Sequence, residues 1–276
     1  MSKTKKITAL LFASILALGA CSAGDKAQND AKNADGTVTI TIGATPVPHV
    51  EILEFVSEKL AKDAGIKLDI KTYTDYVQPN VALDSGDLDA NFFQTPNYLE
   101  AETKEKGYTF EQGKGIHIEP LALYSAKFQQ VSDIPDGATI VVNNDPANQA
   151  RGLKLLEAAD LLQLDADKEI PGIVDIKENP KQLKIVESEG AAIPVQLPDV
   201  EAAVINGNFA LEAGLKPADS LFIEPAEDSP YTNILVWKGD NQKLAAIKKL
   251  DELLHSDAVK EFITNKYPDK NVIPAF

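Results

Sequence analysis

The sequence has few of the residues that usually build metal or catalytic centres. Its 276 residues include one cysteine and three histidines, and His49, His117 and His255 are far apart in the chain. Zinc sites are built mainly from Cys, His and carboxylate ligands, so we expect no metal site and no cofactor. Hydrolase, phosphate-loop and zinc-protease motifs are missing, and we therefore assign no catalytic residue. The 42 Asp and Glu residues leave open a glycosidase-like carboxylate pair.

Positive charge is also scarce. The chain has 27 Lys and Arg residues against 42 Asp and Glu, which gives a net charge of -15 at pH 7. A protein this acidic repels nucleic acid phosphates and anionic lipid head groups, so we expect no nucleic acid partner. Charged residues make up 25% of the chain and hydrophobic ones 44%. These values are typical of a folded globular protein and argue against a disordered chain or a polytopic membrane protein.

Long apolar runs are absent, apart from a short one near the N-terminus. Three lysines precede the apolar residues 7–17, which are too few to span a bilayer, and L-G-A-C follows at 18–21. This pattern predicts a secretory signal peptide at residues 1–20. Its end resembles the bacterial lipobox, in which the cysteine, here Cys21, carries lipid. The alternative is an ordinary cleaved signal beside an incidental cysteine.

Residues 21–36 are small and polar and have no periodic apolar face. We therefore expect a flexible tether between the anchor and the folded body.

The remaining chain alternates predicted strands and helices. Period-two and short apolar runs predict strands at 37–44, 66–73, 90–93, 118–125, 138–142, 183–187, 202–205 and 233–237. Helical spacing and start and stop signals predict helices at 50–61, 76–83, 98–106, 147–162, 193–197, 242–255 and 257–267. The pattern predicts an α/β protein of two lobes. Residues 37–121 form the first part of lobe 1, 122–232 form lobe 2, and 233–276 return to lobe 1, so two chain crossings join the lobes.

Arg151 is the only arginine beside 26 lysines. A guanidinium group can bind a carboxylate through two parallel hydrogen bonds, which lysine cannot do. Asp145 and Pro146 are typical of a helix start, which places Asn148 and Arg151 on one face of its opening turns. Such a helix terminus favours an anion. The alternative is a surface arginine in an ion pair.

Aromatic residues are concentrated in one part of the first lobe. Five of the 18 aromatic residues lie within 26 positions: Tyr73, Tyr76, Phe92, Phe93 and Tyr98. They fall at strand ends and helix starts, where α/β sheets present ligand contacts. A half-polar aromatic wall suits an apolar side chain on a polar backbone. Strand alternation indicates that one of Phe92 and Phe93 belongs to the core.

Two asparagines, Asn206 and Asn233, flank predicted strands. A neutral amide offers both donors and an acceptor, so it can serve an ammonium group and a carboxylate without another buried charge. Each asparagine, taken alone, is equally consistent with a turn.

Six ordered motifs accompany the lipobox over some 240 residues. They are G-A-T-P-V-P-H at 43–49, D-Y-V-Q-P-N at 75–80, D-A-N-F-F-Q at 89–94, N-D-P-A-N-Q-A-R at 144–151, A-V-I-N-G-N-F-A at 203–210 and S-P-Y-T-N-I at 229–234. With these motifs the chain resembles the NlpA/MetQ family of methionine-binding lipoproteins. The resemblance implies a type II periplasmic-binding-protein fold without enzymatic activity. It also implies lipid attachment at the extracytoplasmic face of the cell membrane, and delivery of an amino acid to an ABC permease and its ATPase.

The resemblance also implies a ligand site between the lobes. In it, the arginine holds the α-carboxylate, the asparagines orient the polar backbone, and the aromatic residues enclose the side chain. The expected site residues are Tyr76, Phe93, Thr95, Tyr98, Asn148, Arg151, Asn206 and Asn233.

Thr95 is a departure from the family pattern, because many members have His at this position. The change leaves open another apolar amino acid or a methionyl peptide in place of methionine. No expected contact titrates near neutrality, so binding should be nearly constant between about pH 5.5 and 8. An envelope hydrolase on the same fold and a surface adhesin are the alternatives from other functional classes.

Overall fold

The computed structural model describes residues 32–276. The predicted signal peptide, Cys21 and most of the predicted tether lie outside these residues. Residues 32–36, at the end of that tether, form a hydrogen-bonded turn. Lys32 pairs with Val38 in an antiparallel bridge, and the Asn33 side chain donates to the hydroxyls of Thr37 (2.8 Å) and Thr39 (2.9 Å). Side-chain hydrogen bonds of this kind are not visible in a small and polar composition.

The first lobe contains a six-stranded sheet of order β13-β4-β12-β3-β1-β2. Its strands are β1 (Val38–Ala44), β2 (Ile66–Thr72), β3 (Ala90–Gln94), β4 (Phe110–Ile118), β12 (Thr232–Lys238) and β13 (Ile273–Pro274). Its helices are η1 (Pro46–Val50), α1 (Glu51–Lys59), α2 (Gln78–Ser85), α3 (Pro96–Lys106), α7 (Leu244–Leu254) and α8 (Asp257–Lys266). Buried apolar residues of α1, α7 and α8 pack on one face of the sheet, and those of α2 and α3 pack on the other.

The second lobe contains a five-stranded sheet of order β11-β5-β10-β6-β9. Its strands are β5 (Ala122–Tyr124), β6 (Thr139–Asn143), β9 (Lys184–Ser188), β10 (Ala202–Ile205) and β11 (Phe222–Ile223). Helix α4 (Pro146–Ala158) packs on one face, and α5 (Ile193–Gln196) and α6 (Gly207–Glu212) pack on the other. The remaining short elements are β7 (Gln163–Leu164), β8 (Ile176–Glu178), η2 (Val131–Asp133), η3 (Ile173–Asp175), η4 (Gly190–Ala192) and η5 (Pro217–Asp219).

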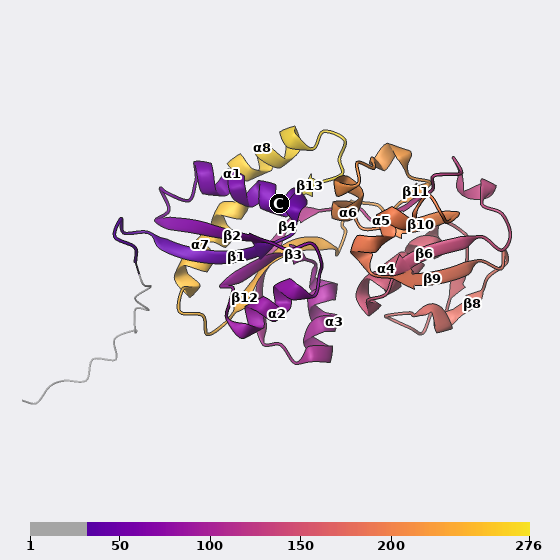
Figure 1. Ribbon diagram of the computed structural model, residues 1–276, viewed down its shortest axis with the longest axis horizontal. Coiled ribbons are helices and arrows are strands. Elements are labelled where there is room, and N and C mark those ends of the chain that lie inside the picture. The colour runs from indigo at the N-terminus through magenta and orange to yellow at the C-terminus, as the bar shows by residue number, and fades with distance from the viewer. Residues whose placement is uncertain (1–31) are drawn as a thin grey trace, which may run out of the picture.

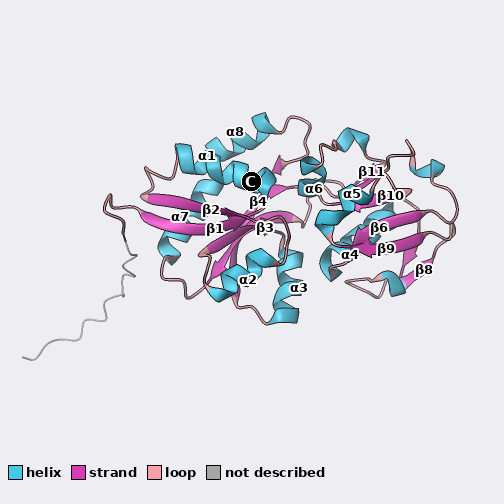
Figure 2. Ribbon diagram, viewed as in Figure 1, coloured by secondary structure: helices cyan, strands magenta, loops and turns pink. Residues whose placement is uncertain are grey.

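Two chain crossings join the lobes, which lie side by side in Figures 1 and 2. One runs from β4 to β5 and the other from β11 to β12, so that β12 lies between β3 and β4 in the first sheet. The predicted fold class, two α/β lobes joined by two chain crossings, is confirmed. The crossings bring residues 119–121 and 224–231 to the junction of the lobes, where α6 also lies (Figure 1).

Two predicted elements differ from the structure. The predicted strand at 118–125 is the end of β4 and the whole of β5, which belong to different sheets. The long polar part of β4, with Gly113 and Gly115, has no apolar alternation and was not predicted. The predicted helix at 147–162 ends at Ala158, and Asp160 adopts a φ of 58°, a left-handed conformation that stops an α-helix.

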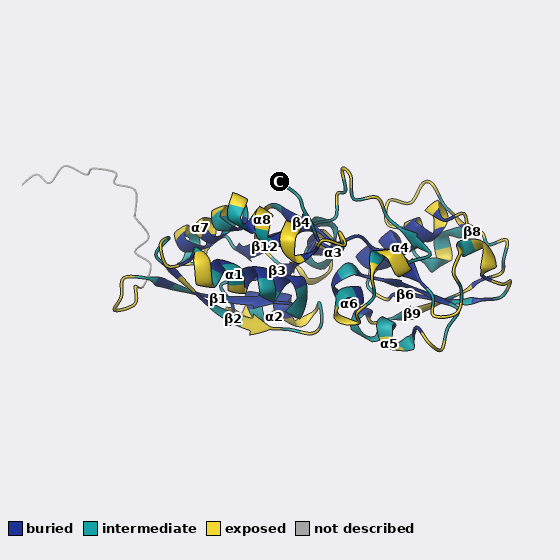
Figure 3. Ribbon diagram, turned by 90° about the horizontal axis from the view of Figure 1, so that it is seen from above, coloured by how far each residue is buried: buried dark blue, intermediate teal, exposed yellow. Residues whose placement is uncertain are grey.

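The buried residues lie mainly in the strands of the two sheets. Figure 3 shows their strands mostly buried, while exposed residues gather on the outer helices and loops. Within residues 32–276, no helix combines the length and apolar character needed to cross a membrane.

Candidate binding site

A small pocket lies at the junction of the lobes, with a cavity volume of about 20 Å³. It is lined by residues from both lobes and from the first crossing: Tyr76, Phe93, Gln94, Thr95, Tyr98, Glu119, Asn148, Arg151, Asn206, Gly207, Asn208 and Asn233. All eight residues that the sequence suggested for a ligand site line this one pocket. Gln94, Glu119, Gly207 and Asn208 were not suggested.

Three aromatic rings form the first lobe's wall of the pocket. The ring centroids of Tyr76, Phe93 and Tyr98 lie 5.8 to 5.9 Å from one another. Tyr76 also stacks on Phe209 of the second lobe at 4.8 Å, so the wall continues across the junction. Strand alternation turns the Phe92 side chain away, into the core of the first lobe. Burial raises the pKa of the Tyr76 hydroxyl well above its ordinary value, so the wall carries no negative charge.

A network of buried amides fixes the strand beneath this wall. Asn80 and Gln94 exchange hydrogen bonds of 3.1 and 2.8 Å, and Asn91 joins them at 2.9 Å. The network ties the start of α2 to β3 and holds Phe93 toward the pocket. It gives a structural reason for the amides in the two motifs at 75–80 and 89–94.

Thr95 lies at the pocket as the residue before α3. Its hydroxyl donates to the side-chain oxygen of Asn97 at 2.7 Å, and the residue is mostly buried. The Thr95 hydroxyl is therefore already engaged within the protein.

The second lobe contributes the start of α4 and a chain of amides. Asp145 is the predicted N-cap and accepts from the Asn148 backbone amide at 2.8 Å, which confirms the helix start. Asn143 donates to Asn206 (2.7 Å), and Asn206 donates to Asn148 (2.9 Å). Asn148 donates in turn to the Asp145 carboxylate (3.1 Å). Because each amide is fixed by its neighbour, Asn148 and Asn206 have defined orientations at the pocket.

Arg151 is a buried residue with 5% exposure, not a surface one. Its Nε donates to Glu224 at 3.0 Å, its Nη2 also contacts that carboxylate, and Nη2 donates to the Glu119 backbone oxygen at 3.1 Å. The guanidinium carbon lies 4.2 Å from the Tyr231 ring centroid. Arg151 thus contacts both chain crossings, and the ion pair expected for a surface arginine is present in a buried form. Within the described residues, these hydrogen bonds use Nε and Nη2 and leave Nη1 without one.

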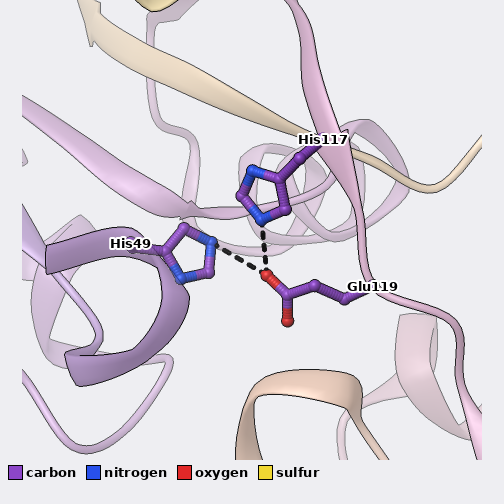
Figure 4. A group of neighbouring side chains, drawn as sticks. All are labelled: His49, His117 and Glu119. Carbon is purple, nitrogen blue, oxygen red and sulfur yellow. Dashed lines mark hydrogen bonds and ion pairs between the residues drawn. The ribbon is translucent and has the colours of Figure 1, made fainter. Parts of the chain in front are cut away.

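Glu119, on the first crossing, is a buried carboxylate that sequence reasoning missed. Figure 4 shows two imidazoles directed at one of its oxygens: His117 Nε2 is 2.6 Å and His49 Nε2 is 3.3 Å from Oε1. The histidines are distant in sequence, but η1 and β4 bring them together. The run H-I-E-P at 117–120 was the available signal, since it pairs His and Glu at a strand end.

Burial governs the charges in this cluster. It lowers the pKa of His49 to about 4 and that of His117 to about 3, so both imidazoles are neutral near pH 7. Burial also raises the pKa of Glu119, while His49, Arg151 and a hydrogen bond from the Asn208 backbone amide act in the opposite direction. The candidate metal-binding atoms of His49, His117 and Glu119 lie within 4.8 Å of one another, which the sequence did not indicate.

Two further contacts connect the lobes at the pocket. The Tyr76 hydroxyl donates to the Asn208 side-chain oxygen at 2.5 Å, and Asn208 Nδ2 is buried without a partner among the described residues. Gly207 lies against the first crossing, where an added Cβ would be 2.6 Å from Glu119 Cβ. Within the first lobe, Asn233 Oδ1 lies 3.0 Å from His49 Nε2. Asn208 and Gly207 belong to the motif at 203–210, whose glycine allows this close approach.

The pocket therefore combines a guanidinium group, a carboxylate, oriented amides and an aromatic wall in a small space. A guanidinium group and a carboxylate in one pocket match the two charges of a zwitterion, and the aromatic wall matches an apolar side chain.

Comparisons with known proteins identify the family. A family model described as NlpA lipoprotein matches residues 40–276. Methionine-binding lipoprotein MetQ of Bacillus subtilis (strain 168) is 38% identical over 271 residues, which are 96% of this chain and 95% of that protein.

Several solved structures are also similar to this chain. A lipoprotein of Actinomyces odontolyticus has a TM-score of 0.84 and 49% identity, over 86% of this chain and 99% of that chain. A nutrient binding protein of Burkholderia cenocepacia bound to methionine has a TM-score of 0.81 and 38% identity, over 86% of this chain and 100% of that chain. A periplasmic substrate-binding protein of an ABC transporter from Coxiella burnetii has a TM-score of 0.81 and 37% identity, with the same coverage.

Proposed function

The chain belongs to the NlpA lipoprotein family, and on this basis we propose that it is the substrate-binding protein of an ABC importer. It captures an amino acid between its lobes and delivers it to the permease. Methionine is the proposed ligand, since one relative is named for methionine binding and another was solved with methionine bound. One observation carries the proposal: Arg151 and Glu119 line the same small pocket beside an aromatic wall.

The charged residues divide the ligand's polar groups between them. Arg151 binds the α-carboxylate through the N–H groups that its contacts with Glu224 and Glu119 leave available. Glu119 binds the α-ammonium group, because a buried carboxylate near a positive charge is far more favourable than one without a partner. Asn206 and Asn233 orient the polar backbone, with Asn148 holding Asn206 in place.

The aromatic residues bind the side chain. Tyr76, Phe93 and Tyr98 form a largely apolar surface, and a thioether makes favourable contacts with aromatic rings. Thr95 is smaller than the imidazole that the family resemblance leads us to expect at this position, and we propose that the pocket accepts a slightly larger side chain there. The protein releases its ligand unchanged, since its pocket serves capture and not chemistry.

Attachment to the membrane is the second part of the proposal. The lipobox predicts that Cys21 carries lipid, with the folded body on the extracytoplasmic face near the permease. Membership of a lipoprotein family supports this placement. Cys21 itself lies outside the described residues.

Isothermal titration tests the ligand class. We expect L-methionine to bind. The affinities of D-methionine, leucine, cysteine and glycyl-methionine then measure the selectivity of the pocket. One methylene in an apolar pocket discriminates by only about 1 to 3 kcal/mol, so a slightly bulkier side chain should compete measurably. Absence of binding to all five compounds would place the ligand outside the methionine group.

A further inference from the structure

We infer that His49 and His117 are positioning residues for Glu119. The neutral His117 imidazole donates to one carboxylate oxygen, His49 Nε2 lies 3.3 Å from the same oxygen, and together they direct the other oxygen at the ligand's ammonium group. The pocket then selects ligands that have a free α-amine. This inference rests on the proposed function, because it concerns the same pocket.

The contacts around Glu119 carry the first step. Both Nε2 atoms approach the same oxygen, Oε1, at 2.6 and 3.3 Å. Figure 4 shows the second oxygen of the carboxylate pointing away from both imidazoles. Glu119 also lines the pocket. The protein therefore holds one carboxylate oxygen, and the other oxygen remains available to accept a hydrogen bond from the ligand.

The direction of the hydrogen bonds follows from the partners. An ionised carboxylate only accepts, so His117 Nε2 must donate to Glu119. His117 Nδ1 is buried and has no partner among the described residues, which fits an unprotonated nitrogen better than a buried N–H. His49 Nε2 faces a second oxygen, that of Asn233 at 3.0 Å, and its Nδ1 lies 2.7 Å from the Thr45 hydroxyl. Nε2 of His49 is thus also a donor.

Both histidines are held rigidly enough to orient a carboxylate. They are 1% and 0% exposed, and Phe92 packs edge-on against both rings at 4.7 and 5.4 Å. Neutral donors stabilise the ionised carboxylate without cancelling its charge, so Glu119 keeps its attraction for a cation. An imidazolium in the same position would compete with the ligand's ammonium group.

The same three side chains also resemble a metal site. The hydrogen bonds instead favour the interpretation that the histidines position the Glu119 carboxylate. Histidines that bind a metal nearly always donate their second ring N–H to an oxygen or to water. His117 Nδ1 has no such acceptor among the described residues.

The experiment compares ligands with and without the amine. L-Methionine and 4-(methylthio)butanoate, which lacks the ammonium group, are titrated into the wild type, His117→Phe and His117→Gln, using displacement for the weaker ligand. We expect His117→Phe to weaken methionine binding about tenfold or more, the scale of one charged hydrogen bond, and to leave the amine-free analogue within about twofold. Glutamine, which can supply an N–H at a similar position, should restore most of the affinity.

Controls separate this role from a structural one. His255→Gln alters the third histidine, which bonds to the Asp251 and Gly115 backbone oxygens away from the pocket, and should leave both affinities unchanged. Thermal unfolding of each variant reports folding. Equal loss for both ligands in His117→Phe, or no rescue by glutamine in a folded variant, would overturn the inference. If the wild type binds neither ligand, the proposed function fails instead.

Zinc chloride completes the test. We expect no zinc-dependent change in the unfolding temperature or in methionine affinity of the wild type. Stoichiometric zinc that competes with methionine and is lost in His117→Phe would overturn the inference, because it would make the histidines metal ligands.

Discussion

At the scale of single residues, Arg151 performs two tasks that its sequence context suggested only in part. Its rarity and its helix start indicated a carboxylate partner. The structure supplies an internal one, Glu224, which also accepts from the Leu121 backbone amide at 2.9 Å. Arg151 therefore stabilises the junction of the two crossings as well as facing the pocket.

Replacement of Arg151 by lysine keeps the charge and removes the planar fork. We expect Arg151→Lys to weaken methionine binding by about 1.5 to 3 kcal/mol, the scale of a charged hydrogen bond. Titration calorimetry measures the loss. Glu224→Gln is the matched control, since it removes the internal partner and keeps the arginine. Unchanged affinity in Arg151→Lys would show that the guanidinium group serves the crossings alone.

We expect Glu119 to make ligand binding depend on pH, whereas the residues suggested by the sequence alone predict a flat profile. Burial raises the pKa of this carboxyl, and only its ionised form attracts an ammonium group. A bound ammonium group lowers that pKa again, so affinity is complete above the raised pKa and is lost as the pH falls through it, by up to about tenfold per pH unit.

The groups that face Glu119 do not titrate in the same range. Burial lowers the pKa of His49 to about 4 and that of His117 to about 3, and it raises the pKa of Tyr76 so that this hydroxyl stays neutral. Glu212 on α6 also has a raised pKa, which makes a control necessary. Calorimetry from pH 8 to acid should give a declining affinity in the wild type and Glu212→Gln, and a weak, flat one in Glu119→Gln. A flat wild-type profile would remove Glu119 from the ammonium site.

At the scale of elements, the sequence was most informative where a single strand or helix determines the position of a side chain. Alternation in β3 predicted that one of Phe92 and Phe93 belongs to the core, and the family resemblance pointed to Phe93 for the pocket. The helix start at Asp145 placed Asn148 and Arg151 together. The eight suggested residues line one pocket because they lie at strand ends and helix starts that the α/β fold brings to the lobe junction.

What was missed depends on contacts between distant segments. Glu119 belongs to the site through its contact with His49, which lies on another element. Asn208 belongs to it through its contact with Tyr76, which lies on the other lobe. Neither contact leaves a periodic pattern in the sequence. The polar strand β4 was missed for the same reason, because its pairing with β12, and not its apolar content, makes it a strand.

The contact between α6 and the first crossing requires glycine. A Cβ at position 207 would lie 2.6 Å from Glu119 Cβ and 3.2 Å from its backbone carbon. We expect Gly207→Ala to destabilise the fold by about 1 to 3 kcal/mol, as overpacking does, and to weaken ligand binding by displacing Glu119. Urea denaturation and calorimetry measure the two effects. Gly172→Ala, whose Cβ would have only ordinary contacts, should change neither, and equal behaviour of both variants would contradict this account of Gly207.

At the scale of the whole molecule, we propose that two lobes and a lipid anchor form a receptor held close to the membrane. We expect Cys21→Ser to move the protein from the membrane fraction to the soluble fraction without altering its ligand affinity, because durable attachment depends on acyl chains. Fractionation and immunoblotting measure the distribution. Full membrane retention of the variant would argue for another means of attachment.

The central claim is that the pocket between the lobes holds one zwitterionic amino acid. Mass spectrometry of small molecules released by denaturing the natively purified protein tests it most directly, since it assumes no ligand in advance. The account predicts close to one equivalent of an α-amino acid, methionine, from the wild type, and much less from Glu119→Gln purified in parallel. A stoichiometric ligand without both an α-amine and a carboxylate would contradict the account.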